Sequence, residues 1–176
     1  MNLDQFWKII DASRSGLGPG RVEGHRQRQL EELRGILSRL PPHEILDFRR
    51  YLLERMDAAF QWDLWGAAYL LAEGCSDDGF ADFRSWLISM GRRVFEAAVS
   101  SADSLVDIAD SPGVEDLFFE EFQYVPAQVY ERLTGHEPPV EPQSVRRNPT
   151  GEAWNEEDLG MLQKRLPGLW ARSHPN

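Results

Sequence analysis

Residues 61–74 read QWDLWGAAYLLAEG, and this stretch does most to indicate the class of fold. Apolar side chains occupy nearly every position after Asp63, so a helix here has little polar surface on any side. A helix that is apolar all round packs in the middle of a domain and not on its surface. We therefore predict a central helix over residues 61–73, with Gly74 as its left-handed C-cap.

The residues that follow predict a short loop and a second central helix. Apolar side chains recur there three or four positions apart, at Phe80, Phe83, Trp86, Leu87 and Met90. Either Ser76 or Asp77 can supply the N-cap of this helix, because short polar side chains accept the free N–H groups of a first turn. Gly91 interrupts the pattern, which resumes at residues 94–99.

Amphipathic patterns before this pair predict more helices. Their apolar stripes lie in residues 3–10, 30–40 and 45–59. Residues 13–24 contain several glycines and Pro19, which predicts a loop. Pro41 and Pro42 separate the next two helices, because proline ends one helix and is accepted in the first turn of another.

The pattern is less decisive after Pro112 and Gly113, which predict a turn. The apolar run at residues 114–122 fits a helix or a strand. Residues 126–133 predict a short helix that Gly135 ends, with three side chains facing inward: Val129, Tyr130 and Leu133. Because no β-alternation stands out, we expect an all-α fold, a single compact domain of about seven to nine helices.

The composition changes after Gly135. Prolines and polar residues describe an extended linker, followed by a last short helix over residues 155–166. Asn155 would cap this helix, its stripe would be Leu159, Leu162 and Leu166, and two tryptophans flank it, Trp154 and Trp170. We expect residues 1–135 to form the helical domain. Residues 136–176 would be an appendage that docks on the body or on a partner.

Charge and cysteine usage bound the class of protein. The 176 residues include 29 Asp and Glu against 19 Lys and Arg, a formal net charge of −10. Nucleic-acid binding normally needs a basic patch, and glutamates dilute the most basic stretch, residues 21–39, so no nucleic-acid partner is expected. With one cysteine, no signal peptide and no long apolar run, we expect a soluble cytoplasmic protein that does not insert into membranes.

The polar groups best suited to chemistry surround the loop between the two central helices: Asp63, Cys75, Ser76, Asp77, Asp78 and Arg84. They could meet at the mouth of a pocket with aromatic walls, and its candidate wall residues are Trp62, Trp65 and Trp86. A structural interpretation explains the same residues as an N-cap and an ion pair of Arg84 with Asp63 or Asp78. We favour the structural interpretation, with Trp65 and Trp86 in the core and Trp62 partly exposed.

Other reactive arrangements have less support. Cys75 could be a nucleophile near a helix N-terminus, but none of the four histidines is placed as an obvious base, so we favour a packing role. No His, Cys or carboxylate cluster has metal-ligand spacing, and no phosphate-binding glycine motif is present. We expect neither a metal nor a cofactor.

Several motifs together resemble the bacterial family called domain of unknown function 4240 (DUF4240). They are WDLWGAAY at residues 62–69, GCSDDGF at 74–80 and FR-x-WLI at 83–88, with FW-x-IID at 6–11. The resemblance covers residues 1–135 and departs at Glu73, where a second small residue is expected before Gly74. It implies a helical fold in the bacterial cytoplasm, and no activity, cofactor or catalytic residue that could be transferred.

Two functions from different classes follow from these observations. We favour a non-catalytic protein-interaction or regulatory module that recognises a protein or peptide. The alternative is a small enzyme or small-molecule binder that uses an acidic and arginine pocket around Asp63, Asp77, Asp78 and Arg84. Convergence of these side chains on a cavity would support the alternative.

Overall fold

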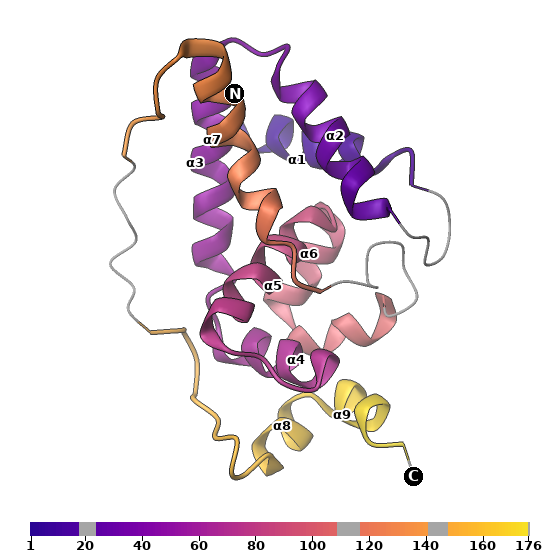
Figure 1. Cartoon of the computed structure of the whole chain (residues 1–176). Helices are drawn as coiled ribbons and strands as arrows, with labels where there is room; N and C mark the ends of the chain where they lie inside the picture. The colour runs from indigo at the N-terminus through magenta and orange to yellow at the C-terminus, as the bar shows by residue number, and fades with distance from the viewer. Residues whose placement is uncertain (18–23, 109–116, 141–147, 176) are drawn as a thin grey trace.

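A computed structural model describes residues 1–17, 24–108, 117–140 and 148–175 of the chain. In these residues the backbone forms nine α-helices and one 3-10 helix, with two isolated β-bridges and no strand, so the all-α prediction is confirmed (Figure 1). No helix among them is long and apolar enough to cross a membrane. The turn predicted at Pro112 and Gly113, much of the loop before Gly24 and the middle of the linker lie outside the described residues.

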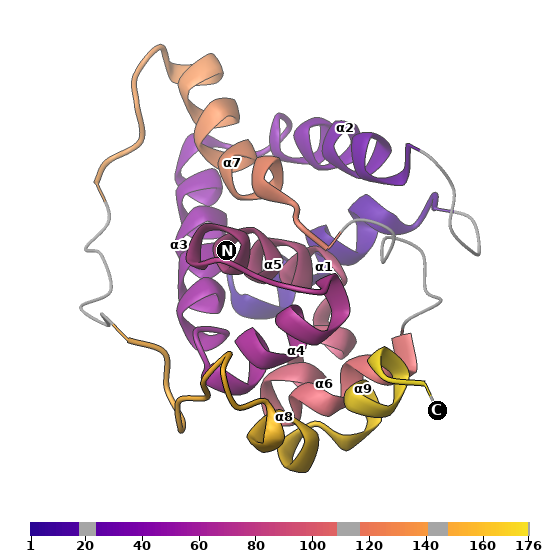
Figure 2. The ribbon, with the colours of Figure 1, turned by 60° about the horizontal axis from the view of Figure 1, so that its bottom comes forward.

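The helices form two groups with a tail below them (Figures 1 and 2). The upper group consists of α1 (Leu3–Arg14), α2 (His25–Leu37), α3 (Pro42–Ala58) and α7 (Glu120–Thr134). The lower group consists of α4 (Trp62–Ala72), α5 (Asp77–Ser89), α6 (Arg92–Ser100) and η1 (Ala102–Ile108). The tail, which we define as residues 148–175, carries α8 (Gly160–Arg165) and α9 (Pro167–Ser173). We call α1–α7 with η1 the body.

One hydrophobic core joins the two groups, and α5 lies at its centre. Every predicted apolar side chain of this segment is buried, among them Phe83 and Trp86 in α5, and Met90 at its C-cap. Helix α5 packs on α3, α4, α6 and α7. The predicted second helix is therefore the central one, because it has body helices around most of its circumference.

Helix α4 is apolar all round for a different reason. Leu64, Ala67 and Ala68 are buried in the core, while Gly66 lies against the tail. The contacts of α4 are with α5 and η1 of the body and with α8 and α9 of the tail. Helix α4 lies between the body and the tail, so apolar side chains on two of its sides are covered.

The C-terminus of α4 differs from the prediction by one residue. Glu73 takes the left-handed conformation (φ 56°, ψ 35°), and Gly74 follows at φ 136°. The N–H of Gly74 donates to the carbonyl of Tyr69 at 3.0 Å, which closes the last turn. A glutamate therefore holds a left-handed position that favours glycine.

Helix α7 begins earlier than predicted and is turned differently. It starts at Glu120 and carries Pro126 inside it, whereas the sequence pattern predicts a start at the proline. Val129 is buried, but Leu133 is 46% exposed and not inward as predicted. The residues of the ambiguous run that are described are irregular up to Phe119 and helical afterwards. Gly135 is the left-handed C-cap (φ 74°), as predicted.

The predicted tail helix is replaced by two shorter helices. Asn155 does not begin a helix, since its side chain accepts the N–H of Glu157 in a turn. Asp158 then accepts the N–H of Gly160, the first residue of α8. Leu166 ends α8, and Pro167 starts α9 in a first-turn position that proline favours.

Candidate functional site

The loop before α5 is organised by Ser76. Its side chain accepts the N–H of Gly79 at 3.1 Å, so Ser76 and not Asp77 is the N-cap. Asp77 and Asp78 lie on the exposed first turn, where the helix dipole favours negative charge. Among the described residues, neither carboxylate has a hydrogen bond or ion pair. The two aspartates therefore face solvent.

Arg84 points away from these aspartates, toward the end of α3. Its Nη1 donates to the carbonyl of Met56 at 2.9 Å and its Nε to the carbonyl of Phe80 at 3.3 Å. The guanidinium lies over the rings of Phe60 and Phe80, 4.7 and 5.1 Å from their centroids. Burial lowers the pKa of Arg84, and Asp57 opposes that shift. A cation near these last carbonyls stabilises the C-terminus of α3.

The predicted ion pair of Arg84 with Asp63 or Asp78 is not formed in the described part of the chain. Asp63 pairs instead with Arg165 of the tail. This pair places Asp63 on the side of α4 that the tail covers. The pairing could not be predicted, because the sequence does not show where α8 docks.

The tryptophans extend the core toward the tail. Trp65 stacks between Trp62 and Phe80, with ring centroids 5.3 and 5.0 Å apart and planes within 10° of parallel. Its indole N–H donates to the carbonyl of Cys75 at 2.9 Å. Trp62 and Trp65 are both half-buried, while Trp86 is buried in the core. Trp65 is therefore a bridge from α4 to the loop and not a fully buried core residue.

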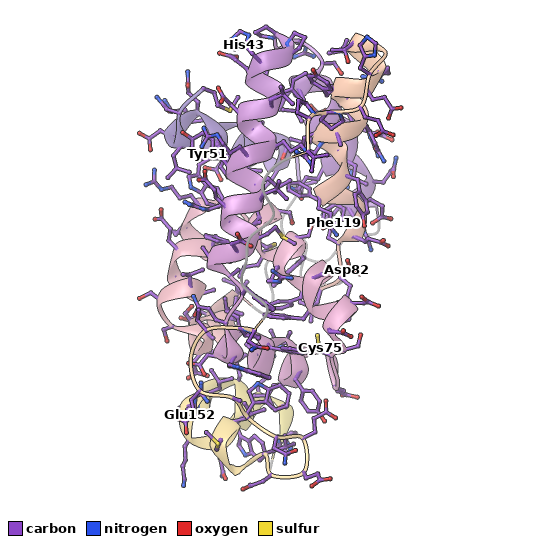
Figure 3. All side chains as sticks on the ribbon, turned by 90° about the vertical axis from the view of Figure 1, so that its left-hand side faces the viewer. His43, Tyr51, Cys75, Asp82, Phe119 and Glu152 are labelled. Atoms are coloured by element: carbon purple, nitrogen blue, oxygen red, sulfur yellow. The ribbon has the colours of Figure 1, made fainter. Side chains whose placement is uncertain are left out.

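Cys75 is buried beside this stack. Burial raises the pKa of the thiol to about 11, and the negative charge of Asp82 adds to the shift. The thiol is close to the carbonyl of Ser76, at 3.5 Å. Because the thiolate is the nucleophilic form, a raised pKa favours the packing role over catalysis. Figure 3 shows Cys75 and Asp82 on the same side of the molecule, with Glu152 of the tail lower down.

The candidate residues therefore separate into three surroundings. The carbonyl of Cys75 accepts the indole N–H of Trp65. Arg84 donates to a carbonyl at the end of α3, and Asp63 pairs with Arg165 of the tail. A cavity of about 90 Å³ lies elsewhere, between α6 and η1, lined by Arg93, Val94, Ala97, Ser104, Leu105, Asp107 and Ile108. None of the predicted site residues lines it.

A contact surface on α4 and η1 receives the tail. Residues 150–154 run alongside the start of α4, where the N–H of Trp62 donates to Thr150 and the N–H of Thr150 donates to Phe60, both at 2.9 Å. The indole N–H of Trp154 donates to the carbonyl of Trp62 at 2.9 Å. The ring of Trp154 meets those of Trp62 and Tyr69 edge-on, with centroids 6.4 and 5.1 Å apart.

Gly66 provides the space for the leucines of the tail. A Cβ at this position would lie 2.6 Å from Cδ2 of Leu162 and 3.3 Å from Cδ1 of Leu166. Both leucines are buried, as is Leu169 of α9. The absence of a side chain at Gly66 thus allows α8 to approach the backbone of α4.

Asp103 of η1 completes the contact. Its two carboxylate oxygens accept the N–H groups of Gly168 at 3.0 Å and Leu169 at 2.9 Å. No side chain of α9 itself caps this helix. The body therefore supplies the N-cap of a tail helix. Val106 of η1 also lies beside the tail, since a Cβ at Gly168 would be 3.3 Å from its Cγ1. We define the tail face by six residues of the body: Trp62, Asp63, Gly66, Tyr69, Asp103 and Val106.

The sequence pattern indicates Trp62 and Asp63 of this face as candidate site residues, but not its other four residues. Two signals were available: the lack of a polar side on α4, and the recurrence of Trp154 and the leucines after a linker. Neither signal reveals that these two segments meet.

A family model described as protein of unknown function (DUF4240) matches residues 1–132. No curated protein and no solved structure matches the chain. Every residue of the tail face lies within the matched part, and the tail lies outside it. The matched part is three quarters of the chain, and the chain belongs to the DUF4240 family of proteins of unknown function.

Proposed function

We propose that this protein is a non-catalytic interaction module of the bacterial cytoplasm whose tail face binds a polypeptide segment. The observation that carries the proposal is the way residues 150–173 are held on α4 and η1. They are held by an anchoring tryptophan, a glycine that admits leucines, and a carboxylate that caps an incoming helix. Aromatic anchors in pockets and apolar helices in grooves are recurrent means of peptide recognition.

Trp154 has the properties of such an anchor. Its side chain is only 9% exposed, and its one hydrogen-bond donor is satisfied by the body. A buried tryptophan contributes a large apolar area, and a paired N–H adds direction. Residues of this kind dominate the binding energy of protein interfaces.

An ion pair of Arg165 with Asp63 joins the tail to the tail face. Helices α8 and α9 carry Lys164, Arg165 and Arg172 and no acidic residue, whereas the tail face carries Asp63 and Asp103. Complementary charge gives orientation and selectivity more than affinity. The complementarity is confined to these two helices, because the part of the tail before them carries four acidic residues: Glu152, Glu156, Glu157 and Asp158.

The enzyme alternative has less support. It requires Asp63, Asp77, Asp78 and Arg84 to meet at one cavity, and their contacts lead in different directions. The raised pKa of Cys75 also argues against a thiolate nucleophile.

The proposal is tested by cutting the linker. A recognition sequence for a specific protease is inserted within residues 141–147, and the purified chain is cut there. We expect the two fragments to remain together at micromolar concentration and to separate on dilution, as measured by tryptophan fluorescence and gel filtration. Immediate separation, with the larger fragment still folded by circular dichroism, would overturn the proposal.

A matched pair of variants shows whether the observed contacts are responsible. Arg165 pairs with Asp63, while its neighbour Lys164 is exposed. Arg165→Ala should weaken the association of the cut fragments, and Lys164→Ala should leave it nearly unchanged. Equal effects of the two would indicate that binding depends on net charge and not on this face.

A further inference from the structure

We propose that the tail is a built-in competitor, which closes the tail face until a partner segment of similar chemistry displaces it. The expected partner carries a tryptophan and then a short basic, leucine-containing helix. This inference rests on the proposed function, because it requires the tail face to bind polypeptide.

The tail is able to leave without unfolding the body. Its helices have six and seven residues, and isolated helices of that length are not stable in water. The tail is therefore ordered by the contacts that it makes with α4 and η1. Helices α8 and α9 pack on each other and on α4 and η1, and the larger contacts among α1, α2, α3, α5 and α7 do not involve the tail. Four tail side chains extend the continuous hydrophobic core from this edge: Trp154, Leu162, Leu166 and Leu169. Segments with few contacts of their own open at lower free energy than the whole domain.

An opened tail would leave a surface suited to a ligand. Trp62, Gly66 and Tyr69 would lose their apolar cover, and Asp63 and Asp103 would lose their partners. Contiguous apolar patches ringed by polar groups mark interaction sites. The unpaired carboxylates select a segment that offers a cation and free helix N–H groups, which are the groups that α8 and α9 supply.

The occupant is expected to be a different protein and not the tail of a second copy. A short linker gives the chain's own tail an effective concentration of the order of millimolar at the tail face. A second copy at micromolar concentration offers the same groups at a far lower concentration. Exchange of tails between copies is therefore disfavoured, and only a segment of higher intrinsic affinity competes.

A free peptide with the sequence of the tail should bind the unchanged chain weakly. When a linked segment competes, the apparent Kd of the free peptide is its intrinsic Kd divided by the fraction of open molecules. For a peptide with the sequence of the tail, this value approaches the effective concentration of the tail, on the order of millimolar. Removing the anchor of the linked tail lowers the apparent Kd toward the intrinsic value. We expect a decrease of roughly tenfold or more, since tryptophan anchors dominate such contacts.

The probe is a labelled synthetic peptide of residues 148–176, titrated by fluorescence anisotropy into three forms of the full chain: unchanged, Trp154→Ala, and cut in the linker. We expect weak binding to the unchanged chain and at least about tenfold tighter binding to Trp154→Ala. The cut chain should also bind tightly after its own tail has been diluted away. Circular dichroism shows whether Trp154→Ala is folded, and the cut chain retains the natural sequence of the body.

Each result has one meaning. Equal affinity for the unchanged and opened chains would overturn the competitor role while leaving the proposed function in place. Absence of binding to both the folded Trp154→Ala chain and the cut chain would overturn the proposed function itself. A third result concerns a second copy of the chain. If the unchanged chain were dimeric at micromolar concentration and the Trp154→Ala variant monomeric, the tail face would bind a second copy, and the inference of a different partner would be overturned.

Discussion

The carboxylate of Asp103 caps a helix that begins far along the chain, since its oxygens accept the backbone N–H groups of Gly168 and Leu169, 65 and 66 residues later. An N-cap is usually supplied by the residue that precedes its helix. Here the cap belongs to η1 of the body, and α9 belongs to the tail. Docking of the tail and capping of α9 are therefore one event.

Asp103→Ala should weaken this docking by about 1 kcal/mol, the usual cost of losing an N-cap. Hydrogen exchange of the amides in α9 measures the effect directly, because these amides are protected only while the tail is docked. Asp107→Ala is the matched control, since Asp107 is an exposed carboxylate of the same 3-10 helix. Comparable loss of protection in both variants would contradict the capping role.

Gly66→Ala should displace the tail, because the new Cβ would lie 2.6 Å from Leu162. Overpacking of this kind costs about 1–3 kcal/mol, which exceeds the gain of up to about 1 kcal/mol in helix propensity. Amides of α8 and α9 should exchange faster. Gly35→Ala in α2 is the control: its Cβ would meet nothing within 4 Å, so the melting temperature should rise. Unchanged exchange of the tail amides in Gly66→Ala would show that Leu162 can move aside.

Glu73→Gly should stabilise the protein by about 1 kcal/mol, because Glu73 holds a left-handed conformation that costs a side-chain-bearing residue energy. The measurement is the urea midpoint of unfolding. Glu73→Ala keeps a Cβ in the same conformation and should not gain this stability. If both variants gained equally, loss of the negative charge and not relief of strain would be responsible.

Cys75 makes stability depend on pH in the alkaline range. Its pKa in the folded protein, about 11, is higher than the ordinary value near 8.5, so the folded state holds the proton more tightly than the unfolded state. This contribution is fully present below the ordinary value and is lost as pH rises through about 11. Urea unfolding at pH 8 and pH 10 should show a larger decrease for the natural chain than for Cys75→Ala. Alkylation of the folded protein by iodoacetamide should also be slow at pH 8, and rapid alkylation there would contradict the raised pKa.

Local chemistry is what the sequence predicts well in this protein. The cap at Gly135, the capping role open to Ser76 and the all-α class depend on neighbouring residues, and the structure agrees. The cap of α4 is misjudged by one residue because glycine is the usual left-handed residue, and Glu73 occupies that conformation instead. Leu133 is misjudged because the predicted helix is too short to fix which side faces inward.

The candidate site depends on contacts between distant segments, which no local pattern reveals. The partner of Asp63 could be Arg84 or Arg165 by charge alone, and only the position of α8 decides in favour of Arg165. Gly66 reads as a weak point in a helix until the leucines of the tail are placed against it. The tryptophan and leucines of the tail indicate that it packs against something, but the residues that it covers lie far away in the sequence.

The two apolar sides of α4 become covered at different times during synthesis of the chain. Synthesis proceeds from the N-terminus at about 5–20 residues per second, so the body is complete seconds before Trp154 and the leucines after it have been made. During that interval the outer side of α4 has nothing of its own chain to cover it. The newly made body therefore passes through a brief stage in which other polypeptides reach this side first, and the order of translation itself gives a partner or a chaperone its earliest access.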